Sequence, residues 1–159
     1  DQEWANETIR PIQDSVPVDI RKVMLGNKLY YDTRLSADNT ISCSSCHGLN
    51  TGGVDNKAFS EGVGGQLGGV NAPTVFNAYY NFVQFWDGRA ATLADQAAGP
   101  PVNPVEMACK SFDEICEKLK DNIRYQCTSE ISVLMCVQQR HVQDHDSSLL
   151  FRCDDTPLL

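Results

Sequence analysis

The spacing of apolar residues along the chain predicts short helices separated by long loops. Between residues 17 and 30, apolar side chains recur at helical intervals, at Ile20, Val23, Met24 and Leu29. Pro17 stands near the start of this predicted helix. A second helix is predicted from Ala90 to Ala98, where alanine dominates. We expect Gly99-Pro100-Pro101 to stop it, because glycine and proline follow helix ends.

A third helix is predicted to begin at Ser111. Ser111 and Glu114 have the spacing of a capping box, in which each side chain accepts a hydrogen bond from the other residue's backbone N–H. The apolar residues that follow lie on one helical face, at Phe112, Ile115, Cys116 and Leu119. The residues from Asp32 to Thr40 have the composition of a turn.

Two stretches between the first and second helices do not have a helical pattern. Residues 48–69 contain three Gly-Gly pairs, which excludes a regular helix or central strand and predicts a long functional loop. The following residues 71–86 are rich in aromatic and apolar side chains. They are Val75, Phe76, Tyr79, Tyr80, Phe82, Phe85 and Trp86.

The overall pattern divides the 159 residues into three parts. Residues 1–16 are predicted to form a polar arm, residues 17–124 one domain, and residues 125–159 a tail without clear periodicity. No apolar run is long enough to cross a bilayer. The net charge of −8 disfavours nucleic-acid binding and suits steering of a basic or dipolar redox partner, although it equally fits an ordinary acidic surface.

The most specific motif is Cys43-Ser44-Ser45-Cys46-His47. Two thiols at this spacing can add to the two vinyl groups of one haem, and the adjacent histidine then becomes the proximal iron ligand. The alternatives are half of a zinc site or a thioredoxin-like redox pair. A second Cys-x-x-Cys motif and a βαβ pattern would support those alternatives, and the sequence contains neither. The motif therefore favours one covalently bound haem c. We expect most of the aromatic and apolar residues of 71–86 to pack around its porphyrin.

Covalent haem attachment predicts an exported protein. The first residues lack the basic and apolar regions of a signal peptide, so we expect one to have been removed and the location to be the periplasm. Five further cysteines remain, at Cys109, Cys116, Cys127, Cys136 and Cys153. An oxidising compartment permits disulfides, but an odd number leaves at least one unpaired and the sequence does not give the pairing.

Beyond the haem motif, residues 25–107 resemble the N-terminal haem domain of the bacterial di-haem cytochrome c peroxidases, the family that includes MauG. The resemblance lies in blocks that occur in the family's order and near its spacing: LGNKLYYDTRLSADNTISCSSCH, GGVDN, NAPTVFNAYYNFVQFWDGRA, LADQAAGP and NPVEM. It covers about half of the chain, and the residues after Tyr125 do not share it. Three explanations fit the loss of resemblance after Tyr125: a divergent tail, a truncated gene or a shifted reading frame.

The resemblance implies roles for individual residues. Cys43 and Cys46 match the haem-linking cysteines, and His47 matches the proximal ligand of the haem where peroxide is cleaved. Trp86 matches the tryptophan between the family's two haems, and Asn71 matches a calcium ligand. The implied partners are hydrogen peroxide and a small cytochrome c or cupredoxin that donates electrons.

Gln96 and Glu106 match a polar pair on the distal side of that haem. Cleaving hydrogen peroxide requires a proton to move from one oxygen to the other, which a carboxylate can do as general base and then general acid. An amide can orient the peroxide and stabilise the charge that develops. Without the resemblance, both residues would be read as ordinary surface positions.

The chain departs from the family in two ways. Val63 stands where many members have a histidine that binds the iron as its sixth ligand. Valine cannot bind iron, so the sequence does not identify the sixth ligand. Met107, His141 and His145 are candidate replacements, although Met107 is more typical of a core residue and the two histidines of an exposed tail. We also expect the family's second haem domain to be absent, which would leave Asn71 and Trp86 without their counterparts.

We therefore expect an all-α, class I cytochrome c-like domain with one covalent haem and a long glycine-rich loop on its distal side. The leading function is a periplasmic peroxidase that reduces hydrogen peroxide to water. The alternative is a monohaem electron-transfer cytochrome c, which requires a strong sixth ligand such as Met107. A MauG-like oxidase and a non-functional remnant that still attaches haem are further alternatives.

Overall fold

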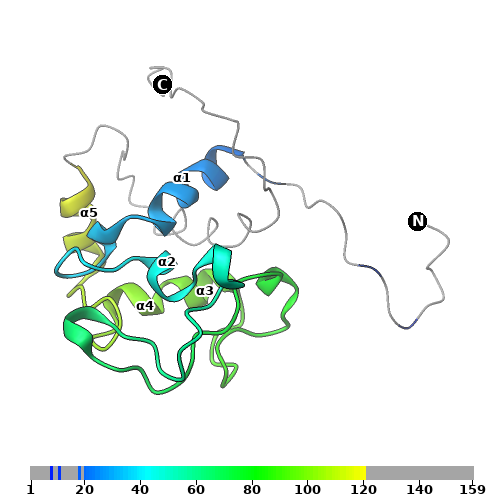
Figure 1. Ribbon diagram of the computed structural model, residues 1–159. Coiled ribbons are helices and arrows are strands. Elements are labelled where there is room, and N and C mark those ends of the chain that lie inside the picture. The colour runs from blue at the N-terminus through cyan, green and yellow to red at the C-terminus, as the bar shows by residue number, and fades with distance from the viewer. Residues whose placement is uncertain (1–7, 9–10, 12–17, 19, 121–159) are drawn as a thin grey trace.

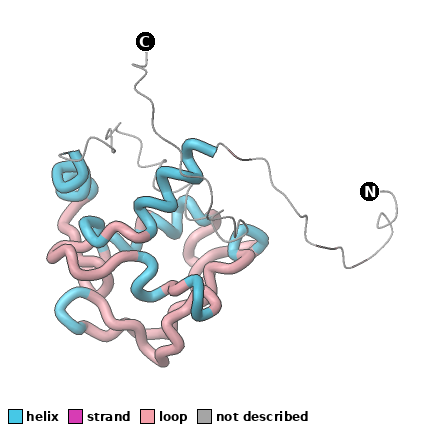
Figure 2. Tube along the Cα trace, turned by 45° about the horizontal axis from the view of Figure 1, so that its top comes forward, coloured by secondary structure: helices cyan, strands magenta, loops and turns pink. Residues whose placement is uncertain are grey.

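The computed structural model describes residues 20–120 and the isolated positions 8, 11 and 18. The helices are α1 (Ile20–Tyr30), α2 (Cys43–Cys46), α3 (Leu93–Ala97), α4 (Gly99–Val102) and α5 (Phe112–Lys120). Four single 3₁₀ turns lie between α1 and α3: η1 (Thr33–Leu35), η2 (Leu49–Thr51), η3 (Val63–Gly65) and η4 (Ala78–Tyr80). Long loops join α2 to α3, and the described residues contain no strand (Figures 1 and 2), which confirms the predicted all-α class.

The core joins the two ends of the described chain. Its buried cluster takes residues from α1, η1, the segment before α5, and α5 itself: Leu29, Leu35, Met107, Cys109, Ile115 and Leu119. Leu29 was predicted from the first apolar stripe, and Ile115 and Leu119 from the third. Burial of these side chains in one shared cluster stabilises α1 and α5, because isolated helices of this length are marginal in water.

Polar contacts bind α5 to the turn after α1. The ammonium group of Lys118 donates to the carbonyl oxygens of Ser36 (2.7 Å) and Ala37 (2.9 Å). The backbone N–H of Ala37 in turn donates to Met107 O at 2.8 Å. These bonds satisfy carbonyls at the end of η1 and hold the segment that precedes α5 in place.

The start of α5 differs in detail from the predicted capping box. The Ser111 hydroxyl accepts from the Glu114 N–H at 3.2 Å, as expected. The Glu114 carboxylate, however, accepts from the N–H of Lys110 at 2.8 Å, one residue earlier than the box requires. The prediction of a helix start was correct, and the carboxylate simply satisfies a different exposed donor.

The second predicted helix, Ala90 to Ala98, ends within one residue of the prediction but begins later, and a further short helix follows it. Thr92 caps α3, with its hydroxyl accepting from Asp95 N–H at 3.1 Å, and α3 ends at Ala97. The chain then continues as α4 through Gly99-Pro100-Pro101. Proline is compatible with a helix's first turn, where its missing N–H has no partner to lose. The prolines therefore begin a short helix here, in addition to ending the previous one.

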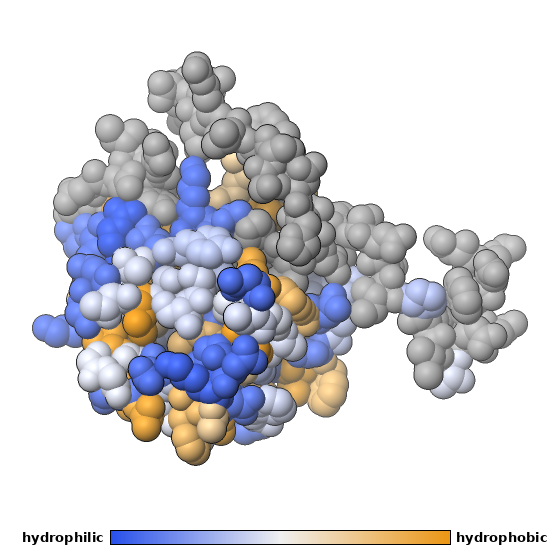
Figure 3. Space-filling view, in the orientation of Figure 1, coloured by the Kyte–Doolittle hydropathy of each residue, from blue (hydrophilic) through white to orange (hydrophobic). Residues whose placement is uncertain are grey.

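Much of the aromatic stretch is exposed. Tyr79, Tyr80, Phe82 and Trp86 are exposed, and Phe82 keeps 93% of its accessible surface. Figure 3 shows apolar surface among hydrophilic residues in the lower part of the view, where Figure 1 has the long loops between α2 and α3. The packing of these aromatic residues around a porphyrin stays a prediction.

The predicted ends of the chain fall almost entirely outside the described residues. Of the arm 1–16, only Thr8 and Pro11 are described, and both are exposed. The tail 125–159 and the last residues of the predicted domain 17–124 lie outside them too. In the part of the chain that the structure describes, no helix is both long and apolar enough to cross a membrane.

Candidate functional site

The Cys-x-x-Cys-His motif forms α2 and the residue after it. The backbone N–H of Ser42 donates to the hydroxyl of Ser45 at 3.0 Å, which helps to start this single turn. Cys43 and Cys46 are three residues apart on the helix and both are half-buried. Side chains at this spacing lie on the same side of a helix. The two thiols are therefore placed to be bridged by one flat apolar group.

His47 ends α2 in an orientation that suits an iron ligand. Its Nδ1 lies 3.1 Å from Pro73 O and 3.3 Å from Gly53 O. Two carbonyls can only accept, so Nδ1 carries the hydrogen and Nε2 keeps its lone pair. Burial lowers the pKa of His47, which favours the neutral ring that a metal binds. Two nearby thiols and a neutral, oriented histidine fit covalent haem c.

Tyr30 supports this ligand from α1. The side chain is 5% exposed, and its hydroxyl donates to the backbone carbonyl of His47. Burial raises the pKa of Tyr30, so the phenol remains protonated and available as a donor. The hydrogen bond thus connects the last residue of α1 to the end of α2.

Replacing Tyr30 with phenylalanine tests this connection. We expect Tyr30→Phe to lower the free energy of unfolding by about 1–2 kcal/mol, because the carbonyl of His47 loses its donor in a half-buried place. Urea unfolding of the haem-loaded protein measures the change. Tyr31→Phe is the matched control, since Tyr31 is 50% exposed and should lose little. Equal stabilities for the two variants would contradict the assigned hydrogen bond.

Glu106 lies in the segment that follows α4 and lines a cavity of about 360 Å³. The other lining residues come from the loop before α3 and from α3 to α4: Phe85, Arg89, Ala90, Asp95, Gly99, Pro100 and Asn103. Burial raises the pKa of Glu106, while the Asn103 side chain and the charge of Arg89 act against that rise. Glu106 is therefore a partly buried carboxyl whose proton affinity is raised, as suits a proton carrier.

Arg89 reaches this cavity from a tight loop. Gln84 and Ala90 pair across its base, with Gln84 N–H donating to Ala90 O at 2.8 Å. Phe85 has a φ of 64°, and the Arg89 guanidinium carbon lies 3.4 Å from the centre of its ring. Asp87 pairs with Arg89 at 2.9 Å. The loop therefore holds the cation between an aromatic face and a carboxylate.

The glycine-rich loop connects Glu106 to the cysteine motif. The carbonyl of Glu61 lies 4.0 Å from the Cys46 sulfur. Two residues later, the N–H of Val63 donates to the carbonyl of Glu106 at 2.8 Å. The pKa of Cys46 is raised by burial first, and further by the negative charges of Asp55 and Glu106. The loop thus places Glu106 near the cysteine motif.

The other predicted site residues are placed less uniformly. Gln96 is half-buried on α3, but the residue of that helix lining the cavity is its neighbour Asp95. Trp86 and Asn71 do meet, because the indole N–H donates to the Asn71 carbonyl at 3.0 Å. Asn71 also lines a second cavity of about 500 Å³ with Asp55, Asn56 and Lys57 among others. Its role as a calcium ligand remains a prediction.

Of the candidate sixth ligands of the iron, only Met107 lies among the described residues. Met107 is 4% exposed and belongs to the hydrophobic cluster between α1 and α5. Val63 lies in η3, on the loop that contacts Glu106. His141 and His145 lie outside the described residues. The placement of Met107 agrees with the core role that its residue type suggests.

The remaining cysteines are only partly described. Cys109 and Cys116 are free thiols, and the Cys109 sulfhydryl donates to the carbonyl of Leu35 at 3.3 Å. Cys127, Cys136 and Cys153 lie outside the described residues. Within residues 20–120, no group of three or more histidine, cysteine or acidic side chains is arranged to hold a metal ion.

Of the eight residues that line the cavity, the sequence pointed to Glu106 alone as a site residue; Arg89 and Asn103 are the polar residues closest to Glu106 that it did not identify. Asn103 had a detectable signal, because an Asn-Pro pair three residues before Glu106 favours a turn that returns the side chain toward the carboxylate. Arg89 follows Asp-Gly, which is also a turn signal. Neither signal indicates by itself that the turn faces a cavity.

Comparison with known proteins gives one consistent family. A model of the family described as di-haem cytochrome c peroxidase matches residues 20–132. The cytochrome c peroxidase Ccp of Escherichia coli is 62% identical over 118 residues, covering 74% of this chain and 25% of that protein. The cytochrome c551 peroxidase of Nitrosomonas europaea is 51% identical over 115 residues, covering 72% and 34%. The methylamine utilization protein MauG of Paracoccus denitrificans is 35% identical, covering 69% and 33%.

Solved structures agree at the level of the fold. The crystal structure of a MauG-like protein associated with microbial copper homeostasis has a TM-score of 0.68 and 25% sequence identity, covering 86% of this chain and 45% of that one. The di-haem peroxidase BthA from Burkholderia thailandensis has a TM-score of 0.66 at 23% identity, covering 85% and 42%. The chain therefore spans about a quarter to a third of the length of these curated relatives and under half of these solved structures.

Proposed function

Because the chain belongs to the di-haem cytochrome c peroxidase family, we propose that it is a haem domain at which hydrogen peroxide is reduced to water. In this proposal the domain is class I cytochrome c-like and carries one haem c, held by Cys43, Cys46 and His47. The glycine-rich loop lies on the distal side. Bound haem c would supply the redox-active iron through which electrons reach the peroxide.

The observation that carries the proposal is the position of Glu106. Glu106 lines a cavity large enough for hydrogen peroxide. The glycine-rich loop joins it to the cysteine motif, through the Val63 N–H bond to Glu106 O (2.8 Å) and the Glu61 carbonyl 4.0 Å from the Cys46 sulfur. Glu106 accepts a proton from one peroxide oxygen and returns it to the other, so that the leaving oxygen departs as water. Two electrons and two protons complete the conversion of hydrogen peroxide into two water molecules.

Gln96 has a weaker claim to a role. We propose that its amide orients the peroxide, as the family resemblance implies. The support is its position on α3, adjacent to Asp95 of the cavity lining. Its own side chain is not among the lining residues of the cavity.

The source of electrons and the location complete the proposal. A small cytochrome c or a cupredoxin donates the electrons, and the exposed indole of Trp86 offers an apolar contact for the electron-delivering partner. Calcium bound at Asn71 belongs to the same proposal, and Asp55 and Asn56 of the shared cavity supply further oxygen atoms. Covalent attachment of haem places the protein in the periplasm.

The spin state of the ferric haem tests whether the site is open. We expect a high-spin signal in the EPR and optical spectra, because Val63 has no ligating atom and Met107 packs in the core. A purely low-spin spectrum would show that a strong-field ligand closes the site. That result would favour the alternative function, a monohaem electron-transfer cytochrome without catalysis.

A further inference from the structure

The side chain of Asn103 makes a defined contact at each end of its amide. Its oxygen, Oδ1, accepts from the Val105 N–H at 3.1 Å. Its nitrogen, Nδ2, donates to Glu106 Oε1 at 2.8 Å. Only the oxygen can accept from a backbone N–H, so the first contact fixes which end of the amide faces Glu106.

The backbone around Asn103 makes this arrangement rigid. The carbonyl of Asn103 accepts from Glu106 N–H at 3.0 Å and from Ala108 N–H at 2.9 Å. The residue therefore closes a turn through its main chain and its side chain at once. Because the turn contains Glu106, the positions of the amide and of the carboxylate are set together.

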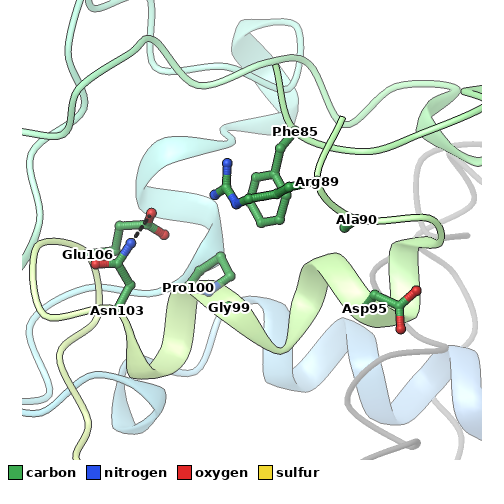
Figure 4. Close-up of a pocket in the computed structure, with 8 residues that line it drawn as sticks. All are labelled: Phe85, Arg89, Ala90, Asp95, Gly99, Pro100, Asn103 and Glu106. Carbon is green, nitrogen blue, oxygen red and sulfur yellow. Dashed lines mark hydrogen bonds between the residues drawn. The ribbon is translucent and has the colours of Figure 1, made fainter. Parts of the chain in front are cut away.

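The contact leaves the two carboxylate oxygens unequal. Oε1 is engaged by the Asn103 amide, so Oε2 is the oxygen better placed to exchange a proton with a bound molecule. In Figure 4 the Glu106 carboxylate and the Arg89 guanidinium point toward one another across the cavity. The Asn103 donor and the Arg89 cation both favour the ionised carboxylate, and so oppose the burial that raises the pKa of Glu106.

Other charged groups near Glu106 have partners of their own. Asp87 pairs with Arg89 at 2.9 Å, and the Asp95 carboxylate accepts from the Thr92 hydroxyl at 2.7 Å. The Cys46 sulfur, which the proposed function makes a thioether, does not titrate in the haem-loaded protein. Asn103 is thus the neutral side chain that contacts the Glu106 carboxylate directly.

We propose that Asn103 is the positioning residue for Glu106, holding one carboxylate oxygen so that the other faces the substrate as an ionised base. The inference rests on the proposed function, because it assigns Glu106 the proton transfer. Asn103 contacts the carboxylate and needs no contact with peroxide. Its influence on the reaction passes through the orientation and protonation of Glu106.

Two substitutions separate this role from a purely structural one. Asn103→Asp keeps an oxygen for the Val105 N–H, loses the donor to Glu106 and adds a negative charge beside it. Asn103→Ala loses both contacts but adds no charge. If Asn103 only shaped the turn, Asp would behave like the wild type and Ala would be the worse variant.

We expect the opposite order. The titration midpoint of Glu106 should rise by about one pH unit or more in Asn103→Asp, because a second carboxylate disfavours ionisation. It should rise less in Asn103→Ala. Below both midpoints, a one-unit rise lowers the ionised fraction, and with it the rate of reaction with peroxide, about ten-fold. Asn81→Asp is the control for added charge, since Asn81 is exposed and does not line the cavity.

Two measurements on the full-length, haem-loaded protein give the result. The first is the infrared carboxyl band of Glu106 against pH, identified by its loss in Glu106→Gln; the second is the pH profile of the peroxide reaction. The expected midpoints rise from wild type to Ala to Asp. An unchanged Glu106 midpoint in both variants, or Asp like wild type with Ala worse, would overturn the proposal. A protein that ignores peroxide altogether overturns the proposed function, and the infrared titration still decides the role of Asn103.

Discussion

Glu106→Gln should slow the reaction of the ferric protein with hydrogen peroxide by about 10²–10⁴-fold, the range typical of a lost general acid–base group. Glutamine has nearly the same shape, and its side-chain oxygen can still accept from Asn103. It cannot take a proton from one peroxide oxygen and return it to the other. Stopped-flow mixing with hydrogen peroxide, followed by the haem absorbance, measures the rate directly.

Glu61→Gln is the matched control for this substitution. Glu61 lies on the glycine-rich loop, but its carboxylate is exposed and pairs with Lys57 at 3.1 Å, an interaction of small energetic value. We expect wild-type rates from it. Superimposable traces for wild type and Glu106→Gln would exclude Glu106 as the proton carrier.

The pH dependence of the wild-type reaction gives a second view of the same group. Glu106 must be ionised to accept a proton, so the rate should fall as the pH falls through its pKa. Burial raises that pKa above the ordinary value for glutamate, and the decline should therefore begin at a higher pH than for an exposed carboxylate. Glu106→Gln should lack this part of the profile.

Stability distinguishes a lost catalytic group from a damaged fold. A carboxyl with a raised pKa binds protons more tightly in the folded state than in the unfolded one. Protonation of Glu106 therefore stabilises the folded state at low pH. This stabilisation is lost as the pH rises from the ordinary pKa of glutamate through the raised pKa of Glu106. At neutral pH the charged Glu106 is a cost to the fold, and Glu106→Gln should be at least as stable as the wild type.

The apolar stripe of α5 is the part of the fold that the sequence predicts well. The stripe is a local pattern, since Ile115 and Leu119 lie one turn apart on α5. Local spacing decides such features, because the helix geometry converts it directly into a shared face.

The arrangement of the cavity depends on contacts between distant segments. Arg89 and Glu106 are brought together by a loop and by α4, and α4 itself was not predicted because Pro100 and Pro101 normally mark an end. The exposed aromatic residues show the same limit. Residue type alone favours burial of Phe82 and Trp86, but only the course of the loops determines which side faces solvent.

Gly62 is the point at which the glycine-rich loop touches the segment that carries Glu106. A Cβ atom on this residue would lie 2.1 Å from the Val105 carbonyl oxygen and 2.7 Å from that of Glu106. Both are backbone atoms, so no side-chain rotation relieves the clash. The φ of −93° is available to any residue, which makes the requirement for glycine here steric.

Gly62→Ala should therefore push the loop away from Glu106. The separation breaks the Val63 N–H bond to Glu106 O (2.8 Å) and the bond from the Gln66 amide to Pro104 O (3.1 Å). We expect the free energy of unfolding to fall by about 1–3 kcal/mol, as for other overpacked positions. Because the backbone of Glu106 moves as well, the peroxide reaction should slow by up to about 10²-fold. Urea unfolding and stopped-flow kinetics measure the two effects on one preparation.

Gly69→Ala provides the control from the same loop. Nothing lies within 4 Å of a Cβ built on Gly69, and its backbone does not require glycine. Its stability should remain within about 0.5 kcal/mol of wild type and its rate unchanged. If Gly62→Ala matched this control in both measurements, the loop would not rest against Glu106 in solution. A loss of stability with an unchanged rate would instead show that the loop stabilises the fold without positioning the carboxylate. Measuring stability and rate together therefore separates the two contributions of this contact.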